Sequence, residues 1–395
     1  MAYINAKGLV LKNVCFSPQR GVSLPEKLAD CYQQFVESSV NDSKHSVIKQ
    51  TVFISAESDT EYYQNKEKIF DYAKLFFRVL PPTSVIAQLP DKGDLMVEII
   101  YMEGLKSSEL VFKENELGAW MVIQRSDMKI VVASDLCQKR KDSGILQQSI
   151  DAFDQLQDIL REEKMEFSDI IRQWNYIEQI TARIAHNNSL SQHYQIFNDV
   201  RSKFYQRSDF GHGFPAATGI GMDKGGIIID FIAAKFTSNS LIVGLKNPVQ
   251  HDAYTYSKEV LAENNAMTDF RQTTPKFERA KAIITPEGKW VFVSGTAAIT
   301  GEVSMAQSSV ELQTELTIQN ILQLISLENL HTHGIGSVRD VKLHYLRAYV
   351  KNRQDIPQVM DICKKHFPLI PIGCVVADVC RPELLVEIEG LADLF

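Results

Sequence analysis

The chain has 395 residues, and its 42 Lys and Arg against 49 Asp and Glu give a formal net charge of −7. With 45% hydrophobic and 23% charged residues it has the composition of a folded protein, long enough for about two to four compact units. The acidic balance argues against a nucleic-acid-binding protein, and no apolar run approaches the roughly 18 residues of a membrane span.

The amino terminus and the cysteines indicate the compartment. The first seven residues lack the basic-then-apolar order of a signal peptide. The six cysteines are scattered and form no CxxC pair, unlike a disulfide framework or a zinc module. We therefore expect a cytoplasmic protein.

The first two thirds of the chain predict two similar sets of elements. The first set is a strand Leu9–Phe16, a helix Glu26–Val40, a strand Val47–Ile54, a helix Glu61–Phe77, and the strands Thr83–Leu89 and Leu95–Tyr101. The second set is the strands Trp120–Ile123 and Lys129–Ala133, a helix Ile145–Leu160, a strand Ile170–Ile177, a helix Tyr194–Tyr205, and the strands Phe214–Met222 and Gly226–Ala234.

The last third shows the pattern most clearly. Residues Val338–Val350 alternate as a strand requires, and Ile356–Phe367 carries an apolar stripe with helical spacing. The other predicted elements are a strand Trp290–Ala298, a helix Val310–Ile325, and the closing strands Ile372–Val379 and Leu384–Ile388. The order β-α-β-α-β-β thus recurs along the chain, which indicates an internal repeat.

Each third ends with a strand that holds a carboxylate among aliphatic neighbours, namely Glu98, Asp230 or Glu387. The order of elements predicts an α+β fold, in which each unit is a mixed sheet with two helices packed on one face. We expect a degenerate amino-terminal unit over residues 1–106 and a middle unit over 107–236. A long connecting loop over 237–282 would lead to the carboxy-terminal unit over 283–395.

The closing strands resemble those of the YjgF/RidA family of reactive-intermediate deaminases, most closely in Ala377-Asp-Val-Cys-Arg-Pro-Glu-Leu-Leu-Val-Glu387-Ile-Glu389. Because that family forms trimers with sites between subunits, the resemblance implies tandem YjgF/RidA-like (chorismate-mutase-like) units, arranged as a monomeric pseudo-trimer. The arginine with which the deaminases bind the substrate carboxylate has no counterpart at Thr83, at Ala217 or in residues 370–374. This difference argues against imine deamination.

From Gln173 to Phe395 the chain also resembles the chorismatases, YjgF-like enzymes that remove pyruvate from chorismate. The motifs are Gln173-Trp-Asn-Tyr176, Tyr194-Gln-Ile-Phe-Asn198 with Arg201, Pro215-Ala-Ala-Thr-Gly-Ile-Gly221, Asn247-Pro248, Phe277-Glu-Arg279 and Ser294-Gly-Thr-Ala-Ala-Ile-Thr-Gly301. One departure is Phe270-Arg271, which stands where the family has a Tyr-Gly pair.

The chorismatase resemblance implies an enzyme of secondary metabolism that acts on a small molecule and needs no metal or organic cofactor. The implied reaction converts chorismate to 3-hydroxybenzoate and pyruvate in the carboxy-terminal catalytic unit. Two alternatives stay open. One is a chorismate hydrolase that gives 3,4-dihydroxycyclohexa-1,5-diene carboxylate, and the other is a non-catalytic binding protein for small metabolites.

Loss of the enolpyruvyl group requires an acid that protonates its methylene carbon, and Glu387 is the candidate. It stands in an apolar strand, where the pKa of a carboxyl group is raised, and it matches the carboxylate that chorismatases use. The alternative is a Glu387 that faces solvent or pairs with Arg381. We expect Glu98 and Asp230 to be structural.

Chorismate carries two carboxylates, which favours arginine as the binding residue. Arg201 lies in the apolar stripe of its predicted helix, and Arg347 lies on the apolar face of its predicted strand. A buried arginine needs an anion, so each is a candidate substrate-binding residue or half of a structural ion pair. The resemblance favours substrate binding for Arg347.

Four more residues complete the predicted site. Arg279 and Tyr256 could bind a carboxylate or the ring hydroxyl, or could be structural. The resemblance implies that Cys380 and Gly295 shape the pocket that selects the product, and that these two residues are typical of enzymes that form 3-hydroxybenzoate. Packing roles are the alternative for both. His331-Thr-His333 offers two metal ligands without a third nearby, so no metal site is expected.

Overall fold

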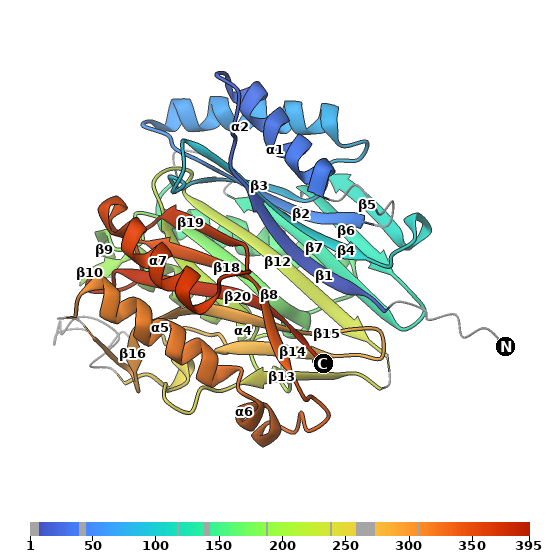
Figure 1. Ribbon diagram of the computed structural model, residues 1–395, viewed down its shortest axis with the longest axis vertical. Coiled ribbons are helices and arrows are strands. Elements are labelled where there is room, and N and C mark those ends of the chain that lie inside the picture. The colour runs from blue at the N-terminus through green and yellow to red at the C-terminus, as the bar shows by residue number, and fades with distance from the viewer. Residues whose placement is uncertain are drawn as a thin grey trace.

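The computed structural model describes residues 8–38, 45–116, 118–137, 143–186, 189–237, 239–257, 273–305 and 308–395. Three mixed sheets with helices at the periphery make up most of this structure (Figure 1). Within these ranges, no helix is both long enough and apolar enough to cross a membrane.

The first unit is a four-stranded sheet with two helices. Its elements are β1 (Val10–Phe16), α1 (Leu24–Ser38), β2 (His45–Ile54), α2 (Asp59–Phe76), β3 (Thr83–Ala87) and β4 (Leu95–Glu103). Helix α2 begins where the Ser58 side chain accepts a hydrogen bond from the Glu61 backbone N–H, which satisfies one of the free donors of the first turn. The strand order is β1-β4-β2-β3, and only β2 and β3 are parallel.

The middle unit adds two strands and a small hairpin to the same plan. Its elements are η1 (Ser107–Glu109), β5 (Leu110–Asn115), β6 (Gly118–Gln124), β7 (Met128–Cys137), α3 (Ile145–Glu162), η2 (Phe167–Asp169), β8 (Ile170–Glu178), β9 (Arg183–His186), β10 (Ser189–Gln192), α4 (His193–Tyr205), β11 (Ala216–Met222) and β12 (Ile227–Phe236). The large sheet has the order β11-β8-β12-β7-β6-β5, and β9 pairs with β10 outside it.

The last unit also has six strands in its large sheet, in the order β13-β14-β15-β20-β18-β19. Its elements are β13 (Leu241–Leu245), η3 (Ala253–Thr255), β14 (Ala280–Ile284), β15 (Lys289–Ala297), β16 (Ile299–Thr300), β17 (Val303–Ser304), α5 (Val310–Leu324), α6 (Leu327–Thr332), β18 (Val341–Val350), η4 (Arg353–Asp355), α7 (Ile356–His366), β19 (Ile372–Val376) and β20 (Val386–Leu394). The segment 237–282, expected as a loop, therefore contributes β13 and the start of β14 to this sheet.

The same strand order lies within all three sheets. It is β1-β4-β2-β3 in the first unit, β7-β12-β8-β11 in the second and β15-β20-β18-β19 in the third. In each case the second and third strands of the unit are parallel and the closing strand lies between the first and the second. The predicted α+β fold of tandem repeated units is confirmed.

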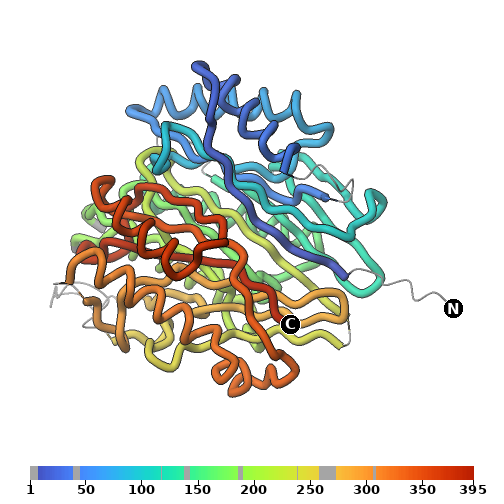
Figure 2. The backbone as a smooth tube through the Cα atoms, in the orientation of Figure 1, coloured from blue at the N-terminus to red at the C-terminus, as the bar shows by residue number. Residues whose placement is uncertain are grey.

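The core is divided between the outer and inner faces of the sheets. One apolar cluster lies between the middle sheet and helices α3 and α4, and another between the last sheet and helices α5 and α7. A third and larger cluster joins the first unit to the inner faces of the other two sheets. Figure 2 shows the resulting arrangement, in which the first and last parts of the chain lie side by side at the centre.

Buried ion pairs connect the units across this central core. Glu98 of β4 binds Arg347 of β18, with 2.5 Å between Oε1 and Nη2 and 2.8 Å between Oε2 and Nε. Asp230 of β12 lies 2.9 Å from Nζ of Lys49 in β2. Each of these four side chains is at most 1% exposed, so each charge depends on its partner for the solvation it has lost.

Removal of one partner should therefore destabilise the whole fold. We expect Lys49→Met to lower the free energy of unfolding by about 3–5 kcal/mol, because the carboxylate of Asp230 would stay buried without its cation. Lys27→Met is the matched control, since the Lys27–Asp94 pair lies at the surface and contributes about 0–1 kcal/mol. Urea unfolding followed by circular dichroism measures both, and equal small losses in the two variants would contradict the assignment.

Candidate active site

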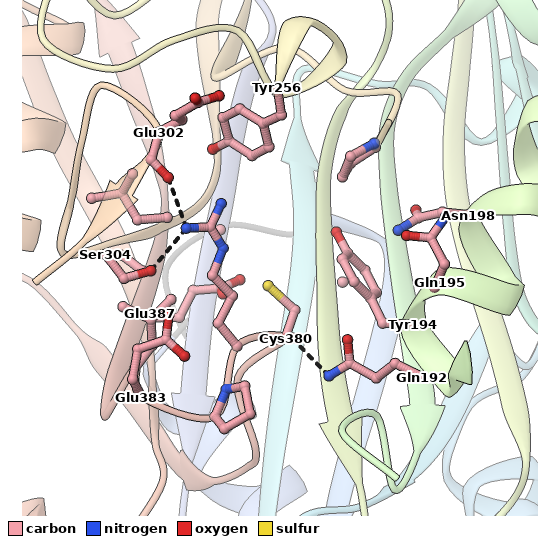
Figure 3. A pocket seen from close by; sticks show the side chains of 18 of the residues that line it. Gln192, Tyr194, Gln195, Asn198, Tyr256, Glu302, Ser304, Cys380, Glu383 and Glu387 are labelled. Atoms are coloured by element: carbon pink, nitrogen blue, oxygen red, sulfur yellow. Dashed lines mark hydrogen bonds between the residues drawn. The ribbon is translucent and has the colours of Figure 1, made fainter. Parts of the chain in front are cut away.

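A cavity of about 470 Å³ lies between the middle and last units. Helix α4 and the β9–β10 hairpin form one wall, and β15, the β16–β17 hairpin and the segment before β20 form the other. Figure 3 shows Tyr194 and Asn198 on one side of this pocket, opposite Tyr256 and Glu387. The pocket thus lies at the boundary between two of the three repeated units.

Glu387 lies in the wall of this pocket. It is 5% exposed, and among the described residues its carboxyl group makes no hydrogen bond or ion pair. It stands on β20 opposite Ala297 of β15, just beyond a bulge between Val293 and Thr296. Gly295 in that bulge makes room for it, because a Cβ atom at position 295 would lie 1.9 Å from the Oε1 atom of Glu387. Glycine is therefore required here for space.

The surroundings of Glu387 favour its protonated form. Burial, followed by the negative charge of Glu389, raises the pKa of Glu387 to about 8, and the charges of Arg172 and Arg279 oppose this shift only in part. Glu387 is therefore mostly a neutral acid at pH 7 that can donate a proton into the cavity.

Glu389 has the opposite environment, although it stands only two residues further along the same face of β20. Its carboxylate accepts hydrogen bonds from Arg172 Nη2 at 2.8 Å, Trp174 Nε1 at 2.8 Å and Thr218 Oγ1 at 2.5 Å. Burial raises the pKa of Glu389, but the charges of Arg347 and Arg172 outweigh burial and lower it to about 2. The two neighbouring carboxyl groups therefore differ in protonation at neutral pH.

Two guanidinium groups in the pocket lining lie close to one aromatic ring, that of Tyr256. The central carbons of Arg279 and Arg381 lie 5.6 and 5.2 Å from the ring centre of Tyr256. Arg279 donates to the Tyr256 hydroxyl at 2.5 Å and to the backbone carbonyl of His251 at 2.6 Å, and Arg381 donates to the Ser304 hydroxyl at 2.8 Å. Within the described part of the chain neither arginine has a carboxylate partner, so both retain positive charge for an anion.

The opposite wall is polar and holds a buried cation behind it. Arg201 of α4 is 1% exposed and donates to Asn198, which lines the cavity, at 2.5 Å. Its Nε atom is buried without a hydrogen-bond partner in the described structure. The Arg201 guanidinium therefore lies one residue behind the pocket wall.

Cys380 closes the pocket near Glu387. Its backbone carbonyl accepts a hydrogen bond from Gln192 across the unit boundary at 3.1 Å (Figure 3). Burial and then the charge of Glu387 raise the pKa of the Cys380 thiol to about 12, so it is a neutral, small side chain rather than a nucleophile.

Most of the residues predicted for the site lie together around this cavity. The lining residues among them are Glu387, Arg279, Tyr256, Cys380 and Gly295. Arg201 lies behind the wall, and Arg347 lies in the central core, where it binds Glu98 and is absent from the described lining residues. The predicted contact of Arg347 with substrate therefore has no support in the geometry, because its guanidinium already has anionic partners.

Two functional candidates were not singled out from the sequence. Arg381 was considered only as a partner of Glu387, yet its guanidinium binds the β16–β17 hairpin and lines the pocket. Glu389 was part of the quoted closing motif, and its spacing of two residues from Glu387 already placed both on one face of the strand. Nothing in the sequence indicated that only one of the two would find cationic partners.

The remaining sequence features lie outside the site. His331 and His333 bond to the backbone carbonyls of Val338 and Asn329, and no group of three potential metal ligands occurs in the described ranges. Phe270 and Arg271, where the motif departs from the chorismatase pattern, lie outside the described residues.

Comparison with known proteins relates the chain to one family. A model described as chorismatase FkbO/Hyg5-like, N-terminal, matches residues 113–233. A 3-hydroxybenzoate synthase from Streptomyces hygroscopicus is 33% identical over 237 residues, which cover 58% of this chain and 65% of that protein. A chorismatase from Streptomyces rapamycinicus is 31% identical over 233 residues, which cover 57% of this chain and 64% of that protein. The chain thus spans a little under two thirds of the length of these curated relatives.

The similarity in fold extends further than the similarity in sequence. A crystal structure of a chorismatase matches 96% of this chain and 98% of its own, with a TM-score of 0.67 and 20% sequence identity. The resemblance indicated by the motifs is confirmed: the chain is similar in sequence to the FkbO/Hyg5-like chorismatases and has the fold of a solved chorismatase.

Proposed function

We propose that the protein converts chorismate to 3-hydroxybenzoate and pyruvate, with Glu387 as the acid. The observation that carries this proposal is a carboxyl group in the pocket wall whose pKa is raised to about 8 and which has no hydrogen-bond or ion-pair partner in the described structure. The names of the relatives, 3-hydroxybenzoate synthase and chorismatase, support the substrate class. Conversion of chorismate to 3-hydroxybenzoate and pyruvate requires no second substrate.

The charge distribution of the pocket suits a dianion. Arg279 and Arg381 present two guanidinium groups about one tyrosine ring, and planar guanidinium groups bind carboxylates through paired hydrogen bonds. Arg201 adds a third positive charge behind Asn198. In this proposal Arg279 and Arg381 bind the substrate carboxylates directly, and Arg201 orients Asn198.

The proposed reaction begins with one proton transfer. Glu387 gives its proton to the methylene carbon of the enolpyruvyl group, where a new C–H bond forms from the π electrons, and an oxocarbenium ion remains. Without water, the neighbouring ring hydroxyl attacks the ring carbon that bears the enolpyruvyl oxygen, the bond between that carbon and that oxygen breaks, and the oxygen leaves with pyruvate. The proton that the ring loses as it becomes aromatic returns to the Glu387 carboxylate. In hydrolysis, water adds to the oxocarbenium carbon instead, the bond from that carbon to the ring oxygen breaks, and the oxygen stays on the ring. Chorismate divides into 3-hydroxybenzoate and pyruvic acid atom for atom, so this outcome consumes no water.

The walls around Glu387 would decide which product forms. Cys380 contributes a small neutral thiol to the pocket wall, and the space left by the absent side chain at Gly295 is filled by the Glu387 carboxyl group. Exclusion of water from the pocket favours capture of the cation by the substrate itself. Hydrolysis to the dihydroxycyclohexadiene acid is the competing outcome, and chromatography of the products distinguishes the two.

Glu387→Gln tests the acid. We expect kcat for pyruvate release from chorismate to fall roughly 10²–10⁴-fold, the usual effect of a positioned general acid, while the variant stays folded. Glu383→Gln is the matched control, because Glu383 also lines the pocket but lies at its half-buried edge. Wild-type turnover by Glu387→Gln would exclude the mechanism, and binding of chorismate without pyruvate release by the unmodified protein would indicate a binding protein instead.

The same substitution should change stability in a pH-dependent way. The pKa of Glu387 rises from 4.5 to about 8 on folding, so the folded state holds its proton more tightly than the unfolded state does. The stability contributed by Glu387 is thus complete below about pH 4.5 and is lost as the pH rises to about 8. Glu387→Gln should therefore become more stable than the unmodified protein as the pH rises, by on the order of a few kcal/mol at pH 8. Thermal unfolding from pH 5 to 9 measures this, with the exposed Glu67→Gln as control; a constant difference would contradict the raised pKa.

Gly295→Ala tests the space that the acid needs. Because the new Cβ would meet Oε1 of Glu387 at 1.9 Å, we expect the carboxyl group to be displaced and kcat to fall at least tenfold, roughly the effect of a misplaced catalytic group. Gly336→Ala is the control, since a Cβ there has no neighbour within 4 Å. Unchanged kcat and product ratio in Gly295→Ala would show that the position of Glu387 does not matter.

A further inference from the structure

The three units place the same chemical groups at equivalent positions of their sheets. In each unit a carboxylate of the closing strand lies opposite one residue of the second strand, and a basic residue stands two positions before that residue on the same face. The opposed pairs are Glu98 with Thr51, Asp230 with Trp174, and Glu387 with Tyr349. The basic residues are Lys49, Arg172 and Arg347.

At two of the three interfaces, the carboxylate of one unit binds the basic residue of the unit before it in a cyclic order. Glu98 of the first unit binds Arg347 of the last, and Asp230 of the middle unit binds Lys49 of the first. The repeat therefore predicts that the remaining carboxylate, Glu387 of the last unit, binds the remaining cation, the arginine at position 172 of the middle unit.

The third interface breaks this rule. Arg172 binds Glu389 instead, with 2.8 Å between Nη2 and Oε2, and Glu389 also lies 3.3 Å from Nη2 of Arg347. The other units have no such second carboxylate, because isoleucine stands at the equivalent positions 100 and 232. Glu389 therefore occurs in the last unit alone, and it binds the cation expected to bind Glu387.

We propose that Glu389 is a positioning residue that keeps the acid of the site unpaired by binding Arg172 in its place. This inference rests on the proposed function for the role of Glu387, and adds the reason why that role falls to the last unit alone. Two effects act in the same direction: Glu389 removes the nearest cation from Glu387, and its own negative charge lies beside Glu387. Both disfavour ionisation of Glu387.

The hydrogen bonds of Arg172 indicate how Glu387 would respond if the negative charge of Glu389 were removed. One terminal nitrogen of the guanidinium, Nη2, binds Glu389 and Thr218, and the other, Nη1, is buried with no hydrogen-bond partner in the described structure. Without a charge on Glu389, Arg172 would be a buried cation whose charge already acts on the unpaired carboxyl group of Glu387. A buried unpaired cation is costly, so Glu387 should ionise to neutralise it.

Several charged or titratable groups face Glu387 and must be considered together. They are Glu389 on its own strand, Tyr349 on the adjacent strand β18, Arg172 on β8 of the middle sheet, Tyr194 on α4, Cys380 before β20, Arg279 just before β14, and Arg381, Glu383, Glu302 and Tyr256 around the pocket. Among them Glu389 and Arg172 alone form an ion pair with each other. Substitution of Glu389 therefore changes the charge of this set in a way that substitution of Arg172 can reverse.

The direct test is a titration of Glu387 that does not depend on turnover. The carbonyl stretching band of a protonated carboxylic acid, identified as the band that Glu387→Gln removes, is followed by infrared difference spectroscopy against pH. We expect the band to disappear near pH 8 in the unmodified protein and roughly 1–3 pH units lower in Glu389→Gln. The double variant Arg172→Gln/Glu389→Gln should return the midpoint towards the original value, and Glu383→Gln should leave it in place.

The pH profile of the proposed reaction provides the second readout. In Glu389→Gln the basic limb of kcat/KM should move to lower pH, with a loss of about tenfold or more at pH 7.5 that is regained at acidic pH. Glu389→Asp, which keeps the charge, should restore much of the original profile. A merely structural role would instead lower kcat/KM equally at every pH.

The outcomes separate this inference from the proposed function. If the unmodified protein releases no pyruvate from chorismate, the proposed function fails, while the infrared titration still decides the role of Glu389. An unchanged Glu387 midpoint in Glu389→Gln, or a double variant that titrates like the single one, would overturn the inference. If Glu389→Gln does not fold, the charge-balanced double variant is compared with Arg172→Gln. The Glu387 midpoint should then be higher in Arg172→Gln, because that variant keeps the negative charge of Glu389.

Discussion

Burial of charge between three sheets is the constraint on which this structure depends. Each unit places a carboxylate and a basic side chain on the inner face of its sheet, where both are buried and an isolated charge would be very unfavourable. The units can pack only if these charges meet across their interfaces. Two of the interfaces satisfy this condition by direct pairing, through Glu98 with Arg347 and Asp230 with Lys49.

The third interface satisfies the same condition with different partners, and for that reason it can hold a reactive group. Glu389 neutralises Arg172, so Glu387 remains without a cation and keeps its proton. In this chain of three similar units, two interfaces thus hold direct carboxylate–cation pairs that stabilise the fold, and the third holds the unpaired Glu387 in the wall of a pocket. A true homotrimer would repeat every interface; a single chain can let one of them diverge while the others keep the protein folded.

The cavity and the acid also suit each other electrostatically. Arg279 and Arg381 carry positive charges that no carboxylate of the described residues pairs with. The pocket is therefore electrostatically favourable for an anion. Of these two arginines, Arg279 lowers the pKa of Glu387 through its positive charge. An anion bound to Arg279 would offset that effect. Binding of a dianion would therefore help to maintain the proton that the proposed reaction uses.

The prediction from sequence was most successful where the signal is local. Periodicity predicted the order of helices and strands in all three units, and helix α5, expected at Val310–Ile325, ends only one residue earlier, at Leu324. It was less accurate at the closing strand, expected at Leu384–Ile388 and found at Val386–Leu394, because Gly390 and Asp393 interrupt the apolar pattern. The short strands β13 and β14 were missed because Pro248, Asn264-Asn265 and Pro275 made the whole segment 237–282 resemble a loop.

The sequence by itself determined that this protein is a threefold repeat of one α+β unit, with a carboxylate in every closing strand and an additional one at Glu389. Only the tertiary structure decided which carboxylate would be paired. That choice is made between residues more than 200 positions apart, as in the contact of Arg172 with Glu389. Burial, distance and competition for a shared cation determine it, and none of these is a property of a local stretch of chain.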